Sequence, residues 1–208
     1  LVFSLVKLES RLVILQVMLL VNGMIADHYI AYNVLTPEEC EFLIEKGKHD
    51  LSDSGIYGSG ETEVNKSKRS SKTSEYTPYG SPDSFVVREL ISQKILRTYR
   101  DIAFSFFKAP IRQIENPQFT HYMKGDFFNW HFDSLPADAT INRDLSASVI
   151  LSDRNDYKGG NLTFKFPHDT LQIEEQQGMM IVFPSLYIHK VQDITDGERA
   201  SIVIWGGL

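Results

Sequence analysis

The chain has 208 residues, the size of one ordinary domain with a sizeable core. With 42% hydrophobic and 23% charged residues, its composition is typical of a soluble globular protein. The formal net charge is −6 and no run of Lys and Arg is long, which argues against nucleic acid and a membrane surface as partners. The one cysteine, Cys40, excludes an internal disulfide framework, so we expect a small core residue in a reducing compartment, the cytoplasm.

Residues 1–23 do not show the pattern of a domain element, and their apolar stretch needs a separate explanation. Residues 12–21 are apolar apart from Gln16, but this stretch is too short to cross a bilayer. Basic residues precede it as in a signal peptide, yet no convincing cleavage site of small residues follows before Met24. We expect residues 1–23 to be an extension upstream of a true start at Met24 or, if they are native, a peripheral helix. Residues 24–208 are expected to form a single domain.

The first part of that domain predicts a strand and then a helix. Residues 25–34 have the pattern of a short strand. Thr36 can cap a helix, Pro37 fits its first turn, and Glu39 stands where a capping box needs an acidic residue. We expect this helix to run to about residue 46 and to be ended by Gly47.

Two longer segments follow. Residues 51–82 are polar and rich in Ser, Gly and Lys, which indicates either disorder or a functional lid. Residues 82–107 predict a long helix whose apolar face packs on a sheet. Its apolar residues at helical spacing are Val86, Val87, Leu90, Ile91, Ile95, Leu96 and Tyr99.

From residue 115 onward the pattern changes to short strands separated by turns. The predicted strands cover residues 118–123, 128–132, 145–151, 161–166, 170–173, 178–183, 190–194 and 199–205, with a loop over 137–143 and a turn at 196–197. Two helices followed by many short strands favour an α+β fold. We expect a double-stranded β-helix, the jelly-roll form of cupin-like enzymes, supported by the N-terminal helices.

Three side chains in this region are candidate metal ligands: His131, Asp133 and His189. Residues i and i+2 of a strand point to the same face, so His131 and Asp133 can lie side by side. A distant His189 can complete one triangular face of an octahedron. Two imidazoles and one carboxylate in this arrangement suit Fe(II) and leave three positions open. Because an H-x-D pair is common by chance, these residues alone support a structural role about as well.

The segments around these residues are more specific. In chain order they are residues 122–125, 143–152, 157–162 and 184–189, followed by Arg199 and Ser201. This order resembles the 2-oxoglutarate and Fe(II)-dependent dioxygenases. Within them it is most similar to the prolyl-4-hydroxylase-like branch, which includes the bacterial PKHD-type hydroxylases. The resemblance covers residues 28–205 and is closest in the second half.

The resemblance implies a set of cofactors and their ligands. Fe(II) would be held by His131, Asp133 and His189, with 2-oxoglutarate and O2 as cosubstrates and ascorbate as an optional addition. The far carboxylate of 2-oxoglutarate needs a fixed cation, and Arg199 can bind it through two parallel hydrogen bonds. Ser201, two residues further along the same strand, can add a hydroxyl donor. Tyr122 matches a tyrosine whose hydroxyl also reaches the cosubstrate.

The resemblance also implies a reaction. Related halogenases replace the carboxylate ligand with a small residue, so Asp133 favours hydroxylation of a C–H bond, coupled to conversion of 2-oxoglutarate to succinate and CO2. By analogy the substrate is a peptidyl proline or a similar residue of a peptide or protein. The centre of the polar segment, with Lys66, Lys68, Arg69 and Lys72, resembles a loop that covers the substrate.

Other interpretations stay open at this point. The substrate could instead be a free amino acid or another small molecule. A cupin-type metalloprotein without oxidative chemistry is the second alternative, and a non-catalytic binding module is the third. Phe128 and Asn161 depart from the family pattern. We expect both to lie near the pocket without touching the ligands.

The remaining candidate residues predict structural roles. Four histidines have no useful partner spacing and are expected on the surface or in the core: His28, His49, His121 and His168. Trp130 should point away from the metal, and Trp205 should pack the last strand or reach the mouth of the pocket.

Overall fold

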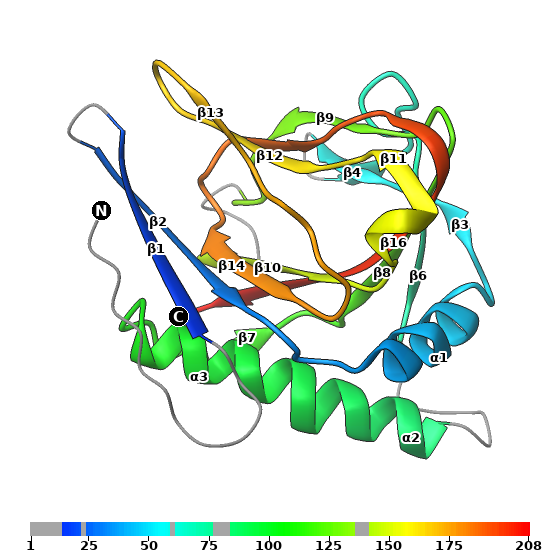
Figure 1. The fold of residues 1–208 in the computed structure, drawn as a ribbon, viewed down its shortest axis with the longest axis horizontal. Helices are drawn as coiled ribbons and strands as arrows, with labels where there is room; N and C mark the ends of the chain where they lie inside the picture. The colour runs from blue at the N-terminus through cyan, green and yellow to red at the C-terminus, as the bar shows by residue number, and fades with distance from the viewer. Residues whose placement is uncertain (1–13, 22–23, 59–60, 77–83, 136–141) are drawn as a thin grey trace.

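The computed structural model describes residues 14–21, 24–58, 61–76, 84–135 and 142–208, and it consists of two packed sheets with helices on one side (Figure 1). The larger sheet is antiparallel and follows the order β1-β2-β14-β10-β16-β8-β6-β3, with β7 and β11 also paired to β16. The smaller sheet follows the order β13-β12-β15-β9, and β4 and β5 form a separate pair.

The strands of the larger sheet are β1 (Ile14–Val21), β2 (Met24–Ala31), β3 (Ser52–Asp53), β6 (Lys72–Glu75), β7 (Gln113–Ile114), β8 (Gln118–Met123), β10 (Leu145–Ile150), β11 (Tyr157–Gly159), β14 (Met180–Pro184) and β16 (Ile194–Gly207). Those of the smaller sheet are β9 (Phe128–His131), β12 (Leu162–Lys165), β13 (Thr170–Gln172) and β15 (His189–Val191). The separate pair is β4 (Ile56–Gly58) and β5 (Glu61–Glu63). The helices are α1 (Pro37–Gly47), α2 (Ser84–Glu89), the π-helix η1 (Leu90–Leu96), α3 (Arg97–Ser105) and the short 3-10 helix η2 (Arg154–Asp156).

Two hydrophobic clusters hold these layers together. The first contains α1 and long-helix residues with side chains from the larger sheet, among them Leu43, Ile95 and Phe119. The second joins the two sheets, since it contains Phe164 of β12 and Phe183 of β14. The sheets therefore enclose an interior on one side, while the helices cover the opposite face of the larger sheet (Figure 1).

Helix α1 has the predicted capping box. The Thr36 hydroxyl accepts from the backbone N–H of Glu39 at 3.3 Å, and the Glu39 carboxylate accepts from that of Thr36 at 2.9 Å. The predicted role of Gly47 differs, because the helix includes Gly47 and is capped by Lys48 in a right-handed conformation. A Cβ at Gly47 would lie 2.4 Å from the ring of Phe119, so the glycine allows close packing of the helix on the sheet.

The predicted long helix is present as three consecutive segments: α2, η1 and α3. Leu90 and Ile95 are both buried and five residues apart, which is the i to i+5 spacing of a π-helix. The π segment therefore keeps apolar side chains on the sheet. Val86 departs from the predicted buried stripe, since it is 47% exposed.

One prediction for the N-terminal half is wrong. Residues 14–21 are a strand and not a peripheral helix, because β1 pairs with β2 along its whole length and extends the larger sheet. Of the two alternatives for residues 51–82, disorder does not apply to β6, which pairs with β8 in the same sheet, and the role of a lid stays a prediction. Residues 77–82, and most of the loop predicted at 137–143, lie outside the described residues.

Most strands from β8 onward follow the predicted pattern, although β11 was not predicted and the strand expected at residues 190–194 is divided between β15 and β16. The turn expected at residues 196–197 lies inside β16, which runs without interruption from Ile194 to Gly207. Gly197 has a φ of +73°, and a Cβ there would meet the carbonyl oxygen of Asp156 at 1.9 Å. Because residue 197 is a glycine, β16 can pass close to η2 and then continue as a strand of the larger sheet.

Candidate metal centre

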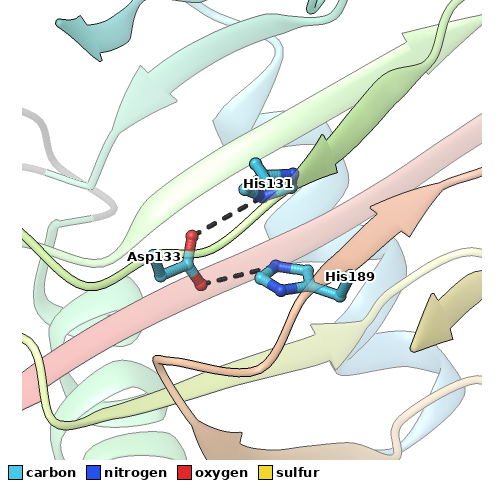
Figure 2. A group of neighbouring side chains, drawn as sticks. All are labelled: His131, Asp133 and His189. Atoms are coloured by element: carbon cyan, nitrogen blue, oxygen red, sulfur yellow. Dashed lines mark ion pairs between the residues drawn. The ribbon is translucent and has the colours of Figure 1, made fainter. Parts of the chain in front are cut away.

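The three predicted metal ligands meet at one point of the interior (Figure 2). His131 ends β9, His189 begins β15, and the two residues are direct partners in the antiparallel pair. Asp133 lies beyond the end of β9, where its backbone N–H donates to the carbonyl oxygen of Ser185 at 2.9 Å. This bond keeps the chain extended after the strand, so Asp133 reaches the side on which His131 lies.

The distances fit a shared ion. Asp133 Oδ1 lies 3.6 Å from His131 Nε2, and Asp133 Oδ2 lies 3.5 Å from His189 Nε2. The three potential ligand atoms all lie within 4.8 Å of one another.

Backbone carbonyls fix the tautomers of the two histidines. His131 Nδ1 lies 2.7 Å from the carbonyl oxygen of Asn129, and His189 Nδ1 lies 2.8 Å from that of Tyr187. A carbonyl can only accept, so in each ring Nδ1 carries the proton and donates. The Nε2 lone pairs then face Asp133 and are available to a metal.

Burial and neighbouring charges set the protonation of this group. Burial lowers the pKa of His131, and the neighbouring His189 adds to this, so the imidazole is neutral at neutral pH. Burial alone would raise the pKa of Asp133, but His189 and His131 hold it below its usual value. A neutral imidazole at His131 and an ionised carboxylate at Asp133 suit the binding of Fe(II), for which two His and one carboxylate are a known ligand set with open positions.

A pocket extends from these ligands into the space between the sheets. It is also lined by Arg69, Tyr122, Phe128, Arg199, Ser201 and Trp205. The indole N–H of Trp205 is buried and meets no hydrogen-bond partner among the described residues. It lies close enough to Asp133 to help lower the pKa of that carboxyl group. An unpaired buried donor beside the ligands fits a site that takes a further polar group.

The three residues predicted for the cosubstrate lie together at the other end of this pocket. Arg199 and Tyr122 are direct partners of β16 and β8, with the guanidinium carbon 5.7 Å from the Tyr122 ring centre. Ser201 Oγ accepts from Arg199 Nη1 at 3.1 Å and lies 2.7 Å from Thr120 Oγ1. Their roles toward a cosubstrate stay predictions.

Arg199 has a partner that sequence reasoning missed. Its guanidinium donates to both carboxylate oxygens of Glu175, from Nε at 3.0 Å and from Nη2 at 2.8 Å. Burial would lower the pKa of Arg199, but the charge and hydrogen bonds of Glu175 more than offset this, and the pKa is raised. No spacing signal links these residues, because Glu175 lies in the connection between β13 and β14.

The prediction that Phe128 does not touch the ligands is wrong. Its ring stacks on that of His131 with centroids 3.5 Å apart and an angle of 13° between the planes. In the pairing of β9 with β15, His131 is opposite His189 and Phe128 is opposite Val191, so β9 carries one extra residue. This irregularity brings positions 128 and 131, three apart, to the same face.

The polar segment 51–82 contributes Arg69 to the pocket, and its lysines stay on the surface. Arg69 is only 6% exposed and lies over the Phe128 ring, 4.6 Å from its centre. Its Nε donates to Ser71 Oγ at 2.8 Å, whereas Lys66, Lys68 and Lys72 are exposed. A charged side chain in a polar sequence carries no local sign of burial, so only the structure identifies Arg69 as a pocket residue.

The other singled-out residues lie away from the ligands. Asn161 does not line the pocket, since it donates to the carbonyl oxygen of Ile173 and accepts from Arg154. Trp130 points away from the metal ligands, and Lys190 lies 4.9 Å from the centre of its ring. His28 and His121 are buried, the latter 2.9 Å from Glu198, while His49 and His168 are exposed.

Comparison with known proteins places this site in a family. Residues 117–206 match the model of the 2OG-Fe(II) oxygenase superfamily, and these residues include all three metal ligands and Arg199. This part of the chain, with the metal ligands in it, is similar to that superfamily. The resemblance predicted from the motifs is therefore confirmed.

The relatives are PKHD-type hydroxylases. One from Shewanella oneidensis is 34% identical over 96 residues, which is 45% of this chain and 43% of that protein. One from a Synechococcus strain is 35% identical over 119 residues, 57% of this chain and 51% of that protein, so the chain spans about half of each. One from Prochlorococcus marinus is 26% identical over 184 residues, 85% of this chain and 76% of that protein.

The solved structures confirm the predicted jelly-roll fold. A Pseudomonas putida prolyl-4-hydroxylase superimposes with a TM-score of 0.65 at 18% identity, covering 87% of this chain and 92% of that one. A Trichoplax adhaerens prolyl hydroxylase in complex with a hypoxia inducible factor peptide superimposes with a TM-score of 0.67 at 16% identity, covering 86% of this chain and 82% of that one.

No helix within the described residues is long and apolar enough to cross a membrane.

Proposed function

We propose that this protein is an oxygenase that uses 2-oxoglutarate, Fe(II) and O2 to hydroxylate a C–H bond in a prolyl or similar residue of a peptide. The observation that carries the proposal is the convergence of two Nε2 atoms and one carboxylate on a single point, with a buried guanidinium in the same pocket. When bound, iron with 2-oxoglutarate supplies the oxidising chemistry, with succinate and CO2 as the other products.

The chain's own residues hold and orient these groups. His131, Asp133 and His189 provide three ligands on one side of the ion, which leaves the opposite positions to cosubstrate and oxygen. Arg199 binds the far carboxylate of 2-oxoglutarate, beside Ser201 and the ring of Tyr122. Arg199 and Ser201 are each 1% exposed and Tyr122 is 2% exposed, so this end of the pocket excludes water.

Three observations support a peptide as substrate. The Pseudomonas putida and Trichoplax adhaerens proteins of the same fold are prolyl hydroxylases, the second in complex with a peptide fragment. In this chain Arg69 and Phe128 provide a buried cation and an aromatic ring beside His131, where the substrate must approach. Exposed apolar side chains flank the ligands on the surface, with Phe132 59% and Leu186 72% exposed.

One observation favours a metalloprotein without oxidative chemistry. Arg199 is already neutralised by Glu175, so it does not require a second carboxylate for its own stability. Under this alternative the pocket would bind a metal, and Arg199 would only connect β16 to the segment before β14.

Anaerobic titration distinguishes the oxygenase from the metalloprotein without oxidative chemistry. Apoprotein is loaded with Fe(II), 2-oxoglutarate is added, and the visible charge-transfer absorption of an iron-chelated 2-oxo acid is followed. Absorption that requires both additions supports the oxygenase, and succinate release in air with proline-containing peptides then tests the substrate class. Iron binding without this absorption would favour the alternative, and no metal binding would contradict both.

A further inference from the structure

The most completely buried acidic group near the pocket is the carboxylate of Glu175, whose side chain is 0% exposed. Four donors converge on it. Oε2 accepts from Arg199 Nε at 3.0 Å and from the Tyr157 hydroxyl at 2.5 Å, and Oε1 accepts from Arg199 Nη2 at 2.8 Å and from the Leu162 backbone N–H at 3.1 Å. Both oxygens are therefore fully used, so Glu175 has no capacity left to bind a metal or a ligand.

These four bonds connect separate parts of the fold. Leu162 belongs to β12 of the smaller sheet, Tyr157 to β11 and Arg199 to β16 of the larger one. Arg199 lines the pocket, whereas Glu175 does not and lies behind it. The carboxylate thus holds the guanidinium from the side that faces away from the pocket.

The hydrogen-bond inventory of Arg199 shows which atoms remain. A guanidinium has five N–H groups, and Glu175 takes the one on Nε and one of the two on Nη2. Ser201 Oγ takes one of the two on Nη1. Among the described residues this leaves one N–H on each terminal nitrogen, and these two N–H groups are available to another carboxylate.

We propose that Glu175 is a positioning residue for the cosubstrate, which it serves by fixing Arg199 so that its two terminal nitrogens face the pocket. The proposal rests on the proposed function, because it assigns 2-oxoglutarate to that pair of donors. Without the carboxylate, Ser201 is the one acceptor that the described part of the chain still offers to Arg199, and the long side chain can adopt other rotamers.

Glu175 also adjusts the charge of the pocket. Arg69 and Arg199 are its buried cations, and Asp133 and Glu175 balance them. With these four groups neutral as a set, Fe(II) is matched by the two negative charges of 2-oxoglutarate. The charge of Glu175 thus limits the net positive charge of the pocket, and its contribution to binding 2-oxoglutarate comes from orienting Arg199 and not from attraction by its own charge.

The test compares two 2-oxo acids on Fe(II)-loaded protein by anaerobic calorimetry. 2-Oxopentanoate equals 2-oxoglutarate except that a methyl group replaces the distal carboxylate, so its binding does not depend on Arg199. In Glu175→Gln the amide nitrogen faces two of the four donors, and bidentate bonding to Arg199 is lost. We expect the Kd for 2-oxoglutarate to rise about tenfold or more, as for other outer-shell partners, with that for 2-oxopentanoate unchanged.

Two further variants complete the design. Glu174→Gln is the matched control, since Glu174 is the exposed neighbour and its substitution should leave both affinities unchanged. Tyr157→Phe removes one of the four bonds and keeps the carboxylate, so it should give a smaller weakening with the same selectivity, even if Glu175→Gln folds poorly.

The outcomes separate failure of the positioning role of Glu175 from failure of the proposed function. Equal affinity of wild type and Glu175→Gln for 2-oxoglutarate, or equal loss for both 2-oxo acids, overturns the positioning role and leaves the proposed function intact. A wild-type protein that binds Fe(II) but not 2-oxoglutarate overturns the proposed function itself.

Discussion

The two ends of the pocket are built in different ways. The two histidine ligands come from β9 and β15, Asp133 follows β9, and β9 is the edge strand of the smaller sheet. Arg199, Tyr122 and Ser201 come from β16 and β8, which have strand neighbours on both sides and lie in the sheet that the helices cover. The His131 side chain is 18% exposed, whereas that of Arg199 is 1% exposed.

Under the proposed function, this difference would serve two requirements. A metal ion and oxygen would have to enter and leave, and His131 stands on the partly exposed edge strand. A cation for a dicarboxylate would have to keep its direction, and Arg199 stands in a central strand with a buried counter-charge. Substitutions at the two ends should therefore have different signatures: loss of metal at one end, and loss of stability with cosubstrate binding at the other.

Asp133→Ala should have the largest effect on activity. It removes one of the three ligands, and the two imidazoles alone do not form the facial set. We expect turnover to fall below detection and Fe(II) affinity to fall strongly, with the circular dichroism spectrum unchanged. Succinate release at the wild-type rate would refute the ligand assignment.

Arg199→Ala should act mainly on stability and cosubstrate binding. It leaves the Glu175 carboxylate buried without its cation, so the free energy of unfolding should fall by about 3–5 kcal/mol in urea titrations. The concentration of 2-oxoglutarate needed for half-maximal activity should rise far more than Fe(II) affinity falls. Equal loss of both would contradict the separation of the two ends.

The metal end should also make the apoprotein sensitive to acid. The pKa of His131 is lowered in the folded state, so below the unfolded value of about 6.5 the unfolded chain binds the proton more readily. The pKa of Asp133 is also lowered in the folded state, so the stability that the ionised carboxylate contributes is lost as the pH falls through this lowered pKa. The free energy of unfolding should therefore decrease from pH 7 to acidic pH, and less steeply in His131→Asn. Parallel pH profiles of the two proteins would contradict this assignment.

Phe128→Leu should have the smallest effect. It removes the stacking on His131, an interaction of about 0.5–1.5 kcal/mol, and so weakens the orientation of one ligand. We expect a modest drop in Fe(II) affinity and little change in affinity for 2-oxo acids. Phe132→Leu, at an exposed aromatic four residues away, is the control and should change neither. Equal effects of the two substitutions would show that the stacking contributes nothing.

The sequence by itself determined the features that depend on near neighbours. The capping box of α1, the apolar face of the long helix and most strands from β8 onward follow from local hydrogen bonds and periodicity. The metal ligands were also readable, since two of them are separated by a single residue and the surrounding motifs are specific.

Tertiary structure alone decided the charge partners and the irregular contacts. Glu175 meets Arg199 because the connection between β13 and β14 lies against β16, and the β9 irregularity places Phe128 against His131. Arg69 is buried although its neighbours in the chain are exposed, and residues 14–21 are a strand because β2 offers an edge to pair with. Burial of a charge or completion of a sheet depends on groups distant in sequence, and no local pattern encodes which groups these are.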